Sequence, residues 1–285
     1  MCRFLIYHGR AMFMSDLLTR SEQSLIRQSY QAREREEPLN GDGFGAGWYM
    51  PEIDELPCVF TSTRPAWSDR NLFRLADKIR SGCIFAHVRA ASPGLMVSEA
   101  NCHPFRYGRF LWMHNGAIAD FRRVKRRLRE SLSDATYDAI EGTTDSEHAF
   151  AAFLDRMLPR GEEYTVDDLT AAMVDTIDRL NGWTQEAGAN EPSRYNFAVT
   201  DGRHVVATRY ASGSDGHPET LYVSSGERFE NVEGRYRMLA ADGQVEAVIV
   251  ASEPLTEERE DWTLVPPNTM VVVSPDFEVR MQPLA

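Results

Sequence analysis

The residues with the clearest chemistry stand at the start of the chain, where Cys2 and Arg3 lead into the apolar run 4–7. If Met1 is removed, the Cys2 thiol, with a pKa of about 8.5, lies beside an α-amine with a pKa of about 7.7 to 8.0. The nucleophile and its proton acceptor then belong to one residue, and a chain that keeps Met1 should be largely inactive. A small residue tolerated before a strand is the simpler interpretation, and Cys2 alone does not exclude it.

A second candidate is the dipeptide Asn115-Gly116, which follows the apolar run 110–113. Its side-chain amide and its flexible backbone N–H can both donate to one developing oxyanion, and losing one such donor raises a barrier by about 2.7 to 4 kcal/mol. The same dipeptide is also a strong signal for a hairpin turn. The residues themselves leave both interpretations open.

Two charged residues could bind the ends of a free amino acid. Arg89 ends the apolar segment 83–88, where its planar fork suits a carboxylate, although a salt bridge is the commoner role of an arginine. Asp145 could pair with an ammonium group, or could serve as a carboxylate at a helix start. A thiol, an oxyanion hole and such a pair of charges together favour amide cleavage.

Three other groups of polar residues point to weaker hypotheses. The glycine-rich segment 40–47 lacks the spacing of a phosphate loop, so we expect backbone packed closely beside the site. His87, His103 and His114 lack metal-ligand spacing with Cys102, which favours buried, hydrogen-bonded histidines; no metal and no cofactor is predicted. The basic run 122–129 is typical of a solvated helix face, with the docking of an acidic partner as the alternative.

Composition limits the class of protein. The chain has 285 residues, of which 42% are hydrophobic and 26% charged, enough for a substantial core, and we expect one domain over 1–285. No apolar run approaches the roughly 20 residues of a membrane helix, which predicts a cytoplasmic protein without membrane contact. The four cysteines lack CxxC pairs, as expected in a reducing compartment, and the net charge of −12 argues against nucleic-acid binding.

Apolar periodicity predicts strands at both ends of the chain and helices in the middle. The expected strands cover residues 2–7, 83–89, 110–113, 195–200, 205–210, 221–224, 247–251, 263–265, 269–273 and 277–281. The expected helices cover 21–31, 68–79 with Ser68 as cap, 121–128, 144–158 behind a Thr144/Glu147 capping box, and 169–180 with Gly182 as stop. This order favours an α+β fold over repeated βαβ units.

Several short motifs occur in one order along the first half of the chain. They are Met1-Cys2-Arg3, Asn40-Gly41-Asp42-Gly43-Phe44-Gly45, Phe85-Ala86-His87-Val88-Arg89, Asn101-Cys102-His103-Pro104-Phe105, His114-Asn115-Gly116 and Thr144-Asp145-Ser146-Glu147. Over at least residues 2–150 this series resembles class II glutamine amidotransferases, members of the N-terminal-nucleophile hydrolase superfamily. The resemblance implies a four-layer αββα sandwich and a γ-glutamyl amide substrate that is hydrolysed through a thioester.

The resemblance also implies a role for each candidate residue. It makes the Cys2 thiol the nucleophile, the Cys2 α-amine the general base and acid, and Asn115 with Gly116 the oxyanion hole. It assigns the α-carboxylate of the γ-glutamyl group to Arg89 and Ser92, and assigns the α-amine to Asp145.

Within the family, the Cys-Arg start is similar to a small stand-alone branch. That branch includes the amidotransferase-like subunit of the alternative glutathione-degradation complex, which is the closer match, and the γ-glutamyl hydrolase of ergothioneine biosynthesis. Residues 195–285 are interpreted as the second half of the sandwich, leaving no room among them for a synthetase domain.

Three functions therefore stay open. The first is hydrolysis of glutamine, glutathione or a related γ-glutamyl conjugate, for which the resemblance allows a partner peptidase. The second is a glutaminase subunit that gives ammonia to a synthetase on another chain. The third is a binding module that grips γ-glutamyl ligands without turnover.

Overall fold

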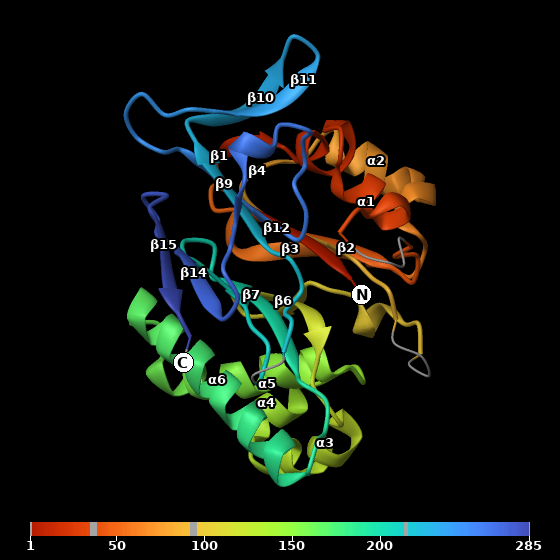
Figure 1. Cartoon of the computed structure of the whole chain (residues 1–285), viewed down its shortest axis with the longest axis vertical. Helices are drawn as coiled ribbons and strands as arrows, with labels where there is room; N and C mark the ends of the chain where they lie inside the picture. Colours follow the sequence, from red (N-terminus) through yellow and green to blue (C-terminus); the bar gives the residue numbers. More distant parts are fainter. Residues whose placement is uncertain (1, 35–38, 92–95, 214–215, 285) are drawn as a thin grey trace.

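Two antiparallel sheets dominate the computed structural model, which describes residues 2–34, 39–91, 96–213 and 216–284 (Figure 1). The first sheet has seven strands in the order β13-β9-β12-β1-β4-β2-β3. Its strands are β1 (Arg3–Phe13), β2 (Phe44–Met50), β3 (Asp54–Ser62), β4 (Arg80–Val88), β9 (Tyr222–Gly226), β12 (Ala247–Ala251) and β13 (Thr263–Leu264).

The second sheet has six strands in the order β15-β14-β8-β7-β6-β5. Its strands are β5 (Phe105–Tyr107), β6 (Phe110–Ala117), β7 (Arg194–Thr200), β8 (Val205–Arg209), β14 (Thr269–Val273) and β15 (Val279–Pro283). A separate hairpin of β10 (Arg228–Val232) and β11 (Arg235–Leu239) projects at the top of Figure 1.

Helices cover the outer faces of both sheets, as Figure 1 shows. Those of the first sheet are α1 (Leu25–Gln31) and α2 (Arg70–Ala76), and those of the second are α3 (Phe121–Glu130), α4 (Asp134–Asp138), α5 (Asp145–Met157) and α6 (Val166–Glu186). Three buried apolar clusters correspond to this arrangement: one under α1 and α2, one under α3, α5 and α6, and one between the sheets. The predicted α+β class is confirmed.

The alternation of side chains along a strand assigns each residue to one of these layers. In β1, Phe4 and Ile6 belong to the cluster between the sheets, whereas Leu5 and Tyr7 face the helices. Burial on both faces explains why this strand is an unbroken apolar run rather than an alternating one. A strand end in either sheet can therefore aim a side chain into the space between the sheets.

Most predicted elements are confirmed, and the differences have local causes. Helix α6 runs through Gly182 to Glu186, because a single glycine weakens a helix without ending it. Helix α2 is capped by Asp69, not by Ser68, since the Asp69 carboxylate accepts the N–H groups of Asn71 and Leu72.

The predicted capping box of α5 is only half formed. Thr144 accepts the N–H of Glu147, but the Glu147 carboxylate accepts the N–H groups of Glu141 and Gly142 instead of that of Thr144. Strands β2 and β3 were not predicted from the sequence, because glycine lowers strand propensity and the segment 54–58 carries exposed charges. No helix in the described part of the chain is long and apolar enough to cross a membrane.

Candidate active site

The candidate nucleophile and the candidate oxyanion hole lie at the ends of strands in different sheets. Phe4 belongs to the core between the sheets, and alternation places Cys2 on the same side of β1. Met113 belongs to that core as well, which places Asn115 on the inner side of β6. The two strands contact each other, so both side chains are directed into one space.

Strand pairing places Cys2 next to the predicted arginine. In the β1 and β4 register Arg3 is opposite Val88, and the Cys2 Sγ atom lies 3.4 Å from the N–H nitrogen of Ala90. Burial raises the pKa of the Cys2 thiol, while the Ala90 N–H and the charge of Arg89 act in the opposite direction. The thiol is therefore protonated at neutral pH and needs a base before it can attack.

A buried ion pair anchors the start of β1. The Arg3 Nε atom donates to Glu253 Oε1 at 2.6 Å, and the two side chains are 0% and 1% exposed. Glu253 also accepts the backbone N–H groups of Arg33 and Glu34, and Arg3 donates to the carbonyl oxygen of Cys2 at 3.0 Å. The Cys-Arg start thus fixes the backbone of the nucleophile, a role that the sequence analysis did not find.

Arg89 is buried at 3% exposure and makes no ion pair within the described part of the chain. Its guanidinium contacts the carbonyl oxygen of Asp42 at 3.4 Å, and its backbone N–H donates to Gly43 at 2.8 Å. A buried guanidinium without a carboxylate is costly, so this position requires an anion that the fold itself does not supply. The structural salt bridge considered from the sequence is not observed among these residues.

The backbone of the glycine-rich segment packs closely against Arg89, as predicted. The Asp42 carboxylate accepts the Ala91 N–H at 2.8 Å, which ties the segment to the chain after β4. Gly43 has φ +116°, and a Cβ there would lie 2.7 Å from Cys102 Sγ and 2.8 Å from the Ser62 carbonyl oxygen. Only glycine fits without displacing these neighbours.

Asn115 and Gly116 lie inside β6 and do not form the hairpin turn that the dipeptide would otherwise suggest. Asn115 is fully buried, and neither atom of its side-chain amide has a hydrogen-bond partner in the described part of the structure. Tyr195, opposite Gly116, gives its N–H to Tyr210, so the ladder alternation directs the Gly116 N–H away from β7. Two adjacent donors are thus left free of the sheet.

Histidines join the two sheets behind this site. His87 donates from Nε2 to the carbonyl oxygen of His114 at 3.3 Å, and His103 stacks on His87 with ring centroids 4.2 Å apart. Burial lowers the pKa of His87 to about 3 and that of His103 well below its ordinary value. No cluster of three metal-ligating side chains is found in the described residues, and the predicted hydrogen bonding is observed for His87 and His114 but not for the His103 ring.

Asp145 stands at the first turn of α5, within reach of the end of β6. One carboxylate oxygen accepts the N–H of Ile118 at 2.8 Å, and the other accepts that of Ser146 at 2.9 Å. The residue is a half-buried helix-start carboxylate, and its partner Ile118 lies two residues after Gly116 in the chain. Ser92, the remaining predicted site residue, lies outside the described residues.

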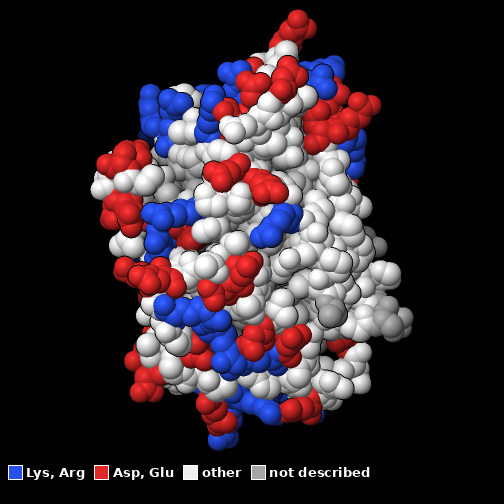
Figure 2. Space-filling view, turned by 90° about the vertical axis from the view of Figure 1, so that its left-hand side faces the viewer, with Lys and Arg blue, Asp and Glu red and all other residues white. Residues whose placement is uncertain are grey.

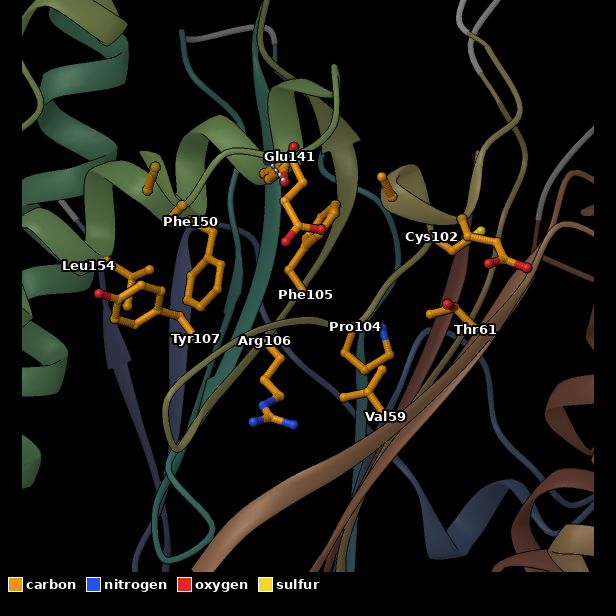
Figure 3. A pocket seen from close by; sticks show the side chains of 15 residues that line it. Val59, Thr61, Cys102, Pro104, Phe105, Arg106, Tyr107, Glu141, Phe150 and Leu154 are labelled. Carbon is orange, nitrogen blue, oxygen red and sulfur yellow. Dashed lines mark hydrogen bonds between the residues drawn. The ribbon is translucent and has the colours of Figure 1, made fainter. Parts of the chain in front are cut away.

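A cavity of about 280 Å³ lies between α5 and β3, close to this site (Figure 3). Phe150 and Leu154 of α5 form one side, and Val59 and Thr61 of β3 form the other. Cys102 lines the cavity and lies close to Gly43 of the glycine-rich segment, since a Cβ at Gly43 would lie 2.7 Å from the Cys102 Sγ atom.

Several side chains of the basic run on α3 have partners on neighbouring residues. Arg126 pairs with Glu130 at 2.7 Å, Arg127 pairs with Glu186, and Arg129 donates to His148 at 2.9 Å. On the face of the molecule that Figure 2 shows, positive and negative side chains are interspersed. These contacts favour the solvated helix face over an acidic docking partner.

Comparison with known proteins identifies the family. The family model described as "Glutamine amidotransferases class-II" matches residues 14–281. The chain belongs to this family. The probable glutamine amidotransferase DUG3 of Saccharomyces cerevisiae is 44% identical over 96% of this chain and 82% of its own length. A γ-glutamyl-hercynylcysteine sulfoxide hydrolase of Mycolicibacterium smegmatis is 28% identical over the full length of both chains.

Two solved structures share the fold. A glutamine aminotransferase class-II domain protein from Silicibacter pomeroyi has a TM-score of 0.68 at 24% identity, with both chains fully covered. The allosteric regulatory enzyme of purine biosynthesis has a TM-score of 0.63 at 14% identity, and the match covers all of this chain and 49% of that one. Together with the family match, these similarities show that the chain has the fold of class II glutamine amidotransferases.

Proposed function

We propose that this class II amidotransferase hydrolyses a γ-glutamyl amide bond through a thioester on Cys2. The observation that carries the proposal is Arg89, a buried guanidinium without a carboxylate partner among the described residues, which the β1–β4 register places opposite Cys2. An α-carboxylate would supply the missing charge, and the free amide of Asn115 faces the same space. The hydrolase named among the relatives acts on a γ-glutamyl compound, which supports the same substrate class.

In the proposed reaction the Cys2 α-amine, freed by loss of Met1, takes the thiol proton, and the thiolate attacks the γ-carbonyl carbon. The oxyanion that forms accepts hydrogen bonds from the Asn115 side chain and the Gly116 N–H. The C–N bond then breaks, the leaving amine takes the proton from the α-ammonium group, and a γ-glutamyl thioester stays on Cys2. The free α-amine deprotonates water, which attacks the thioester, and the thiolate recovers its proton as glutamate leaves.

Binding would use both ends of the γ-glutamyl group. Arg89, with Ser92, would hold the α-carboxylate, because a planar guanidinium donates two parallel hydrogen bonds to such a group. Asp145 would hold the α-ammonium group. Since these contacts fix the amino-acid part alone, glutamine, glutathione and related conjugates are all candidate substrates.

We further infer that residues 1–285 form one domain, a four-layer αββα sandwich of N-terminal-nucleophile hydrolase type. A role in glutathione metabolism, a partner peptidase and a cytoplasmic location extend the proposal by analogy with the branch to which the sequence is similar. A synthetase partner that accepts ammonia is the alternative, and a non-catalytic binding module is the second alternative.

Intact mass spectrometry with the electrophile 6-diazo-5-oxo-L-norleucine tests the proposal. We expect a protein without Met1 that gains one adduct, and no adduct on Cys2→Ala. Arg89→Lys should raise KM for γ-glutamyl substrates strongly while Cys2 still reacts with iodoacetamide, because only the planar fork is lost. Absence of an adduct on Cys2 would contradict its role as nucleophile, and unchanged kinetics in Arg89→Lys would contradict the role of Arg89 in binding the α-carboxylate. Glutaminase activity that appears only with a synthetase would favour the ammonia-donor alternative.

A further inference from the structure

The imidazole of His114, on the helix-covered face of the second sheet, connects helix α5 with strand β7. His114 lies on the outer side of β6, where Nδ1 is 2.9 Å from Ser146 Oγ in the first turn of α5. On its other side Nε2 is 3.0 Å from the carbonyl oxygen of Arg194 in β7. His114 is 1% exposed and Ser146 6%, so water does not compete for these bonds.

The direction of each hydrogen bond follows from the partners. A carbonyl oxygen only accepts, so Nε2 of His114 must carry the hydrogen that it shares with Arg194. Nδ1 is then bare and accepts the hydroxyl hydrogen of Ser146. Burial lowers the pKa of His114, in keeping with a neutral ring that holds a single hydrogen.

The same network clamps β6 on both sides of the oxyanion dipeptide. Ahead of the dipeptide, the His114 ring is held by Ser146 and Arg194. Behind it, the Ile118 N–H is held by the Asp145 carboxylate at 2.8 Å. The Arg194 carbonyl oxygen leaves no space at Gly116, since a Cβ there would lie 1.9 Å from it, so a shift of this carbonyl would move the dipeptide.

The Ser146 hydroxyl has one hydrogen and two acceptors. The preferred acceptor is His114 Nδ1 at 2.9 Å, and Asp145 Oδ1 lies slightly farther away at 3.3 Å. An ammonium group bound to Asp145 would occupy that carboxylate and leave the hydroxyl to His114. Without an ammonium group the carboxylate competes for the hydroxyl, so the ring is held less firmly at Nδ1, while the Arg194 carbonyl oxygen keeps the hydrogen on Nε2.

We propose that His114 and Ser146 are positioning residues that couple recognition of the substrate α-amine at Asp145 to the oxyanion hole at Asn115 and Gly116. This inference rests on the proposed function, because it assigns a role to the amine within that reaction. Its consequence is that the α-amine of a substrate contributes to kcat as well as to KM. Ser146 transmits that contribution without touching the substrate.

Two chromogenic probes that differ only in the amine test this coupling. L-γ-Glutamyl-p-nitroanilide carries the α-amine, and glutaryl-p-nitroanilide keeps the carboxylate but lacks the amine. Both are to be measured with the full chain, with Ser146→Ala, and with Ser146→Thr, which restores the hydroxyl. Ser81→Ala is the matched control, because Ser81 is also buried but lies in β4, where its hydroxyl is within hydrogen-bond distance of the Tyr49 and Cys83 carbonyl oxygens.

The expected result is a change in kcat that is not additive. Loss of the amine should lower kcat by about tenfold or more in the unaltered chain, in Ser146→Thr and in Ser81→Ala, but by less than about threefold in Ser146→Ala, as residues in one network couple. Equal kcat losses in Ser146→Ala and Ser81→Ala would overturn the coupling. An effect on KM alone would do so as well.

A second measurement does not depend on turnover. Side-chain ¹⁵N NMR of the folded protein should show His114 as the neutral Nε2–H form, and Ser146→Ala should keep that form but shift the Nδ1 resonance, because Nδ1 loses its hydrogen-bond donor. An Nδ1–H form in the unaltered chain would overturn the inference even if both anilides are cleaved. If neither anilide is cleaved and Cys2 takes no adduct, the proposed function is contradicted. The NMR result tests the His114–Ser146 hydrogen bond independently of that outcome.

Discussion

The two sheets fix their parts of the candidate site by different physical means. In the first sheet a buried ion pair, Arg3 with Glu253, holds the backbone of Cys2. In the second sheet neutral hydrogen bonds through His114 hold Asn115 and Gly116. The backbone of the Cys2 thiol is thus held by full charges. The two proposed oxyanion donors, Asn115 and Gly116, are held by neutral hydrogen bonds through His114, which place no competing charge beside the oxyanion.

The largest expected effect comes from breaking the ion pair of the first sheet. Arg3→Met leaves Glu253 buried without its cation, and removing one partner of such a pair costs about 3 to 5 kcal/mol of unfolding free energy. Urea denaturation followed by circular dichroism measures this loss. The double variant Arg3→Met/Glu253→Met should recover much of it, because the isolated charge is gone; a double variant as unstable as the single one would contradict the ion-pair explanation.

The next effect concerns Asn115 in the second sheet, where activity rather than stability should change. The amide has no hydrogen-bond partner in the described residues, so Asn115→Ala removes no internal bond, and the urea midpoint should move little. If the amide donates to the oxyanion, kcat should fall by about 10² to 10³-fold with KM nearly unchanged. A large loss of stability with kcat intact would place Asn115 with the structural residues of the first sheet.

Part of this comparison could be predicted from the sequence. The apolar runs at 4–7 and 110–113 locate the strands, and alternation along each strand places Cys2 and Asn115 on inner faces once the sheets are known to face each other. The sequence could not predict that Arg89 lacks a carboxylate partner among the residues the structure describes, since ion pairs depend on the positions of residues far away in the chain. For the same reason the sequence could not predict that Glu253, 250 residues after Arg3, is the partner of that arginine.

Strand β6 and the glycine-rich segment were harder to predict from the sequence, for local reasons. Asn-Gly favours turns, and only the pairing with β7 keeps Asn115 and Gly116 in a strand. Likewise Gly45 and Gly47 weaken the strand signal of β2, although the structure needs them because a Cβ at Gly45 would lie 2.2 Å from the His103 carbonyl oxygen. In both cases tertiary contacts override local propensity.

A pH experiment tests whether the contact between the two sheets is neutral. The pKa of His87 is lowered to about 3 in the folded protein, and in the unfolded chain it is about 6.5. Protonation therefore favours the unfolded chain, so the stability that depends on neutral His87 is fully present above about pH 6.5 and is lost as the pH falls towards 3. At pH 5.5 the loss is about 1.4 kcal/mol for this residue.

The measurement compares urea midpoints at pH 7.5 and pH 5.5 for the unaltered chain and for His87→Gln. The variant lacks the titrating ring, so its difference between the two pH values should be smaller by about 1.4 kcal/mol. If both proteins lose the same unfolding free energy on acidification, the pKa of His87 in the folded protein is not lowered by burial.

The smallest effect is expected from an exposed ion pair, which completes the comparison with Arg3 and Glu253. Arg156 of α5 and Asp175 of α6 pair at 2.5 Å, but their side chains are 42% and 44% exposed. Water solvates both charges in either state, so Arg156→Met should cost only about 0.2 to 1 kcal/mol, and less in 1 M salt, where the pair is screened. The same Arg→Met change in the same urea assay then isolates burial as the cause of the difference, and a loss at Arg156 as large as at Arg3 would contradict it.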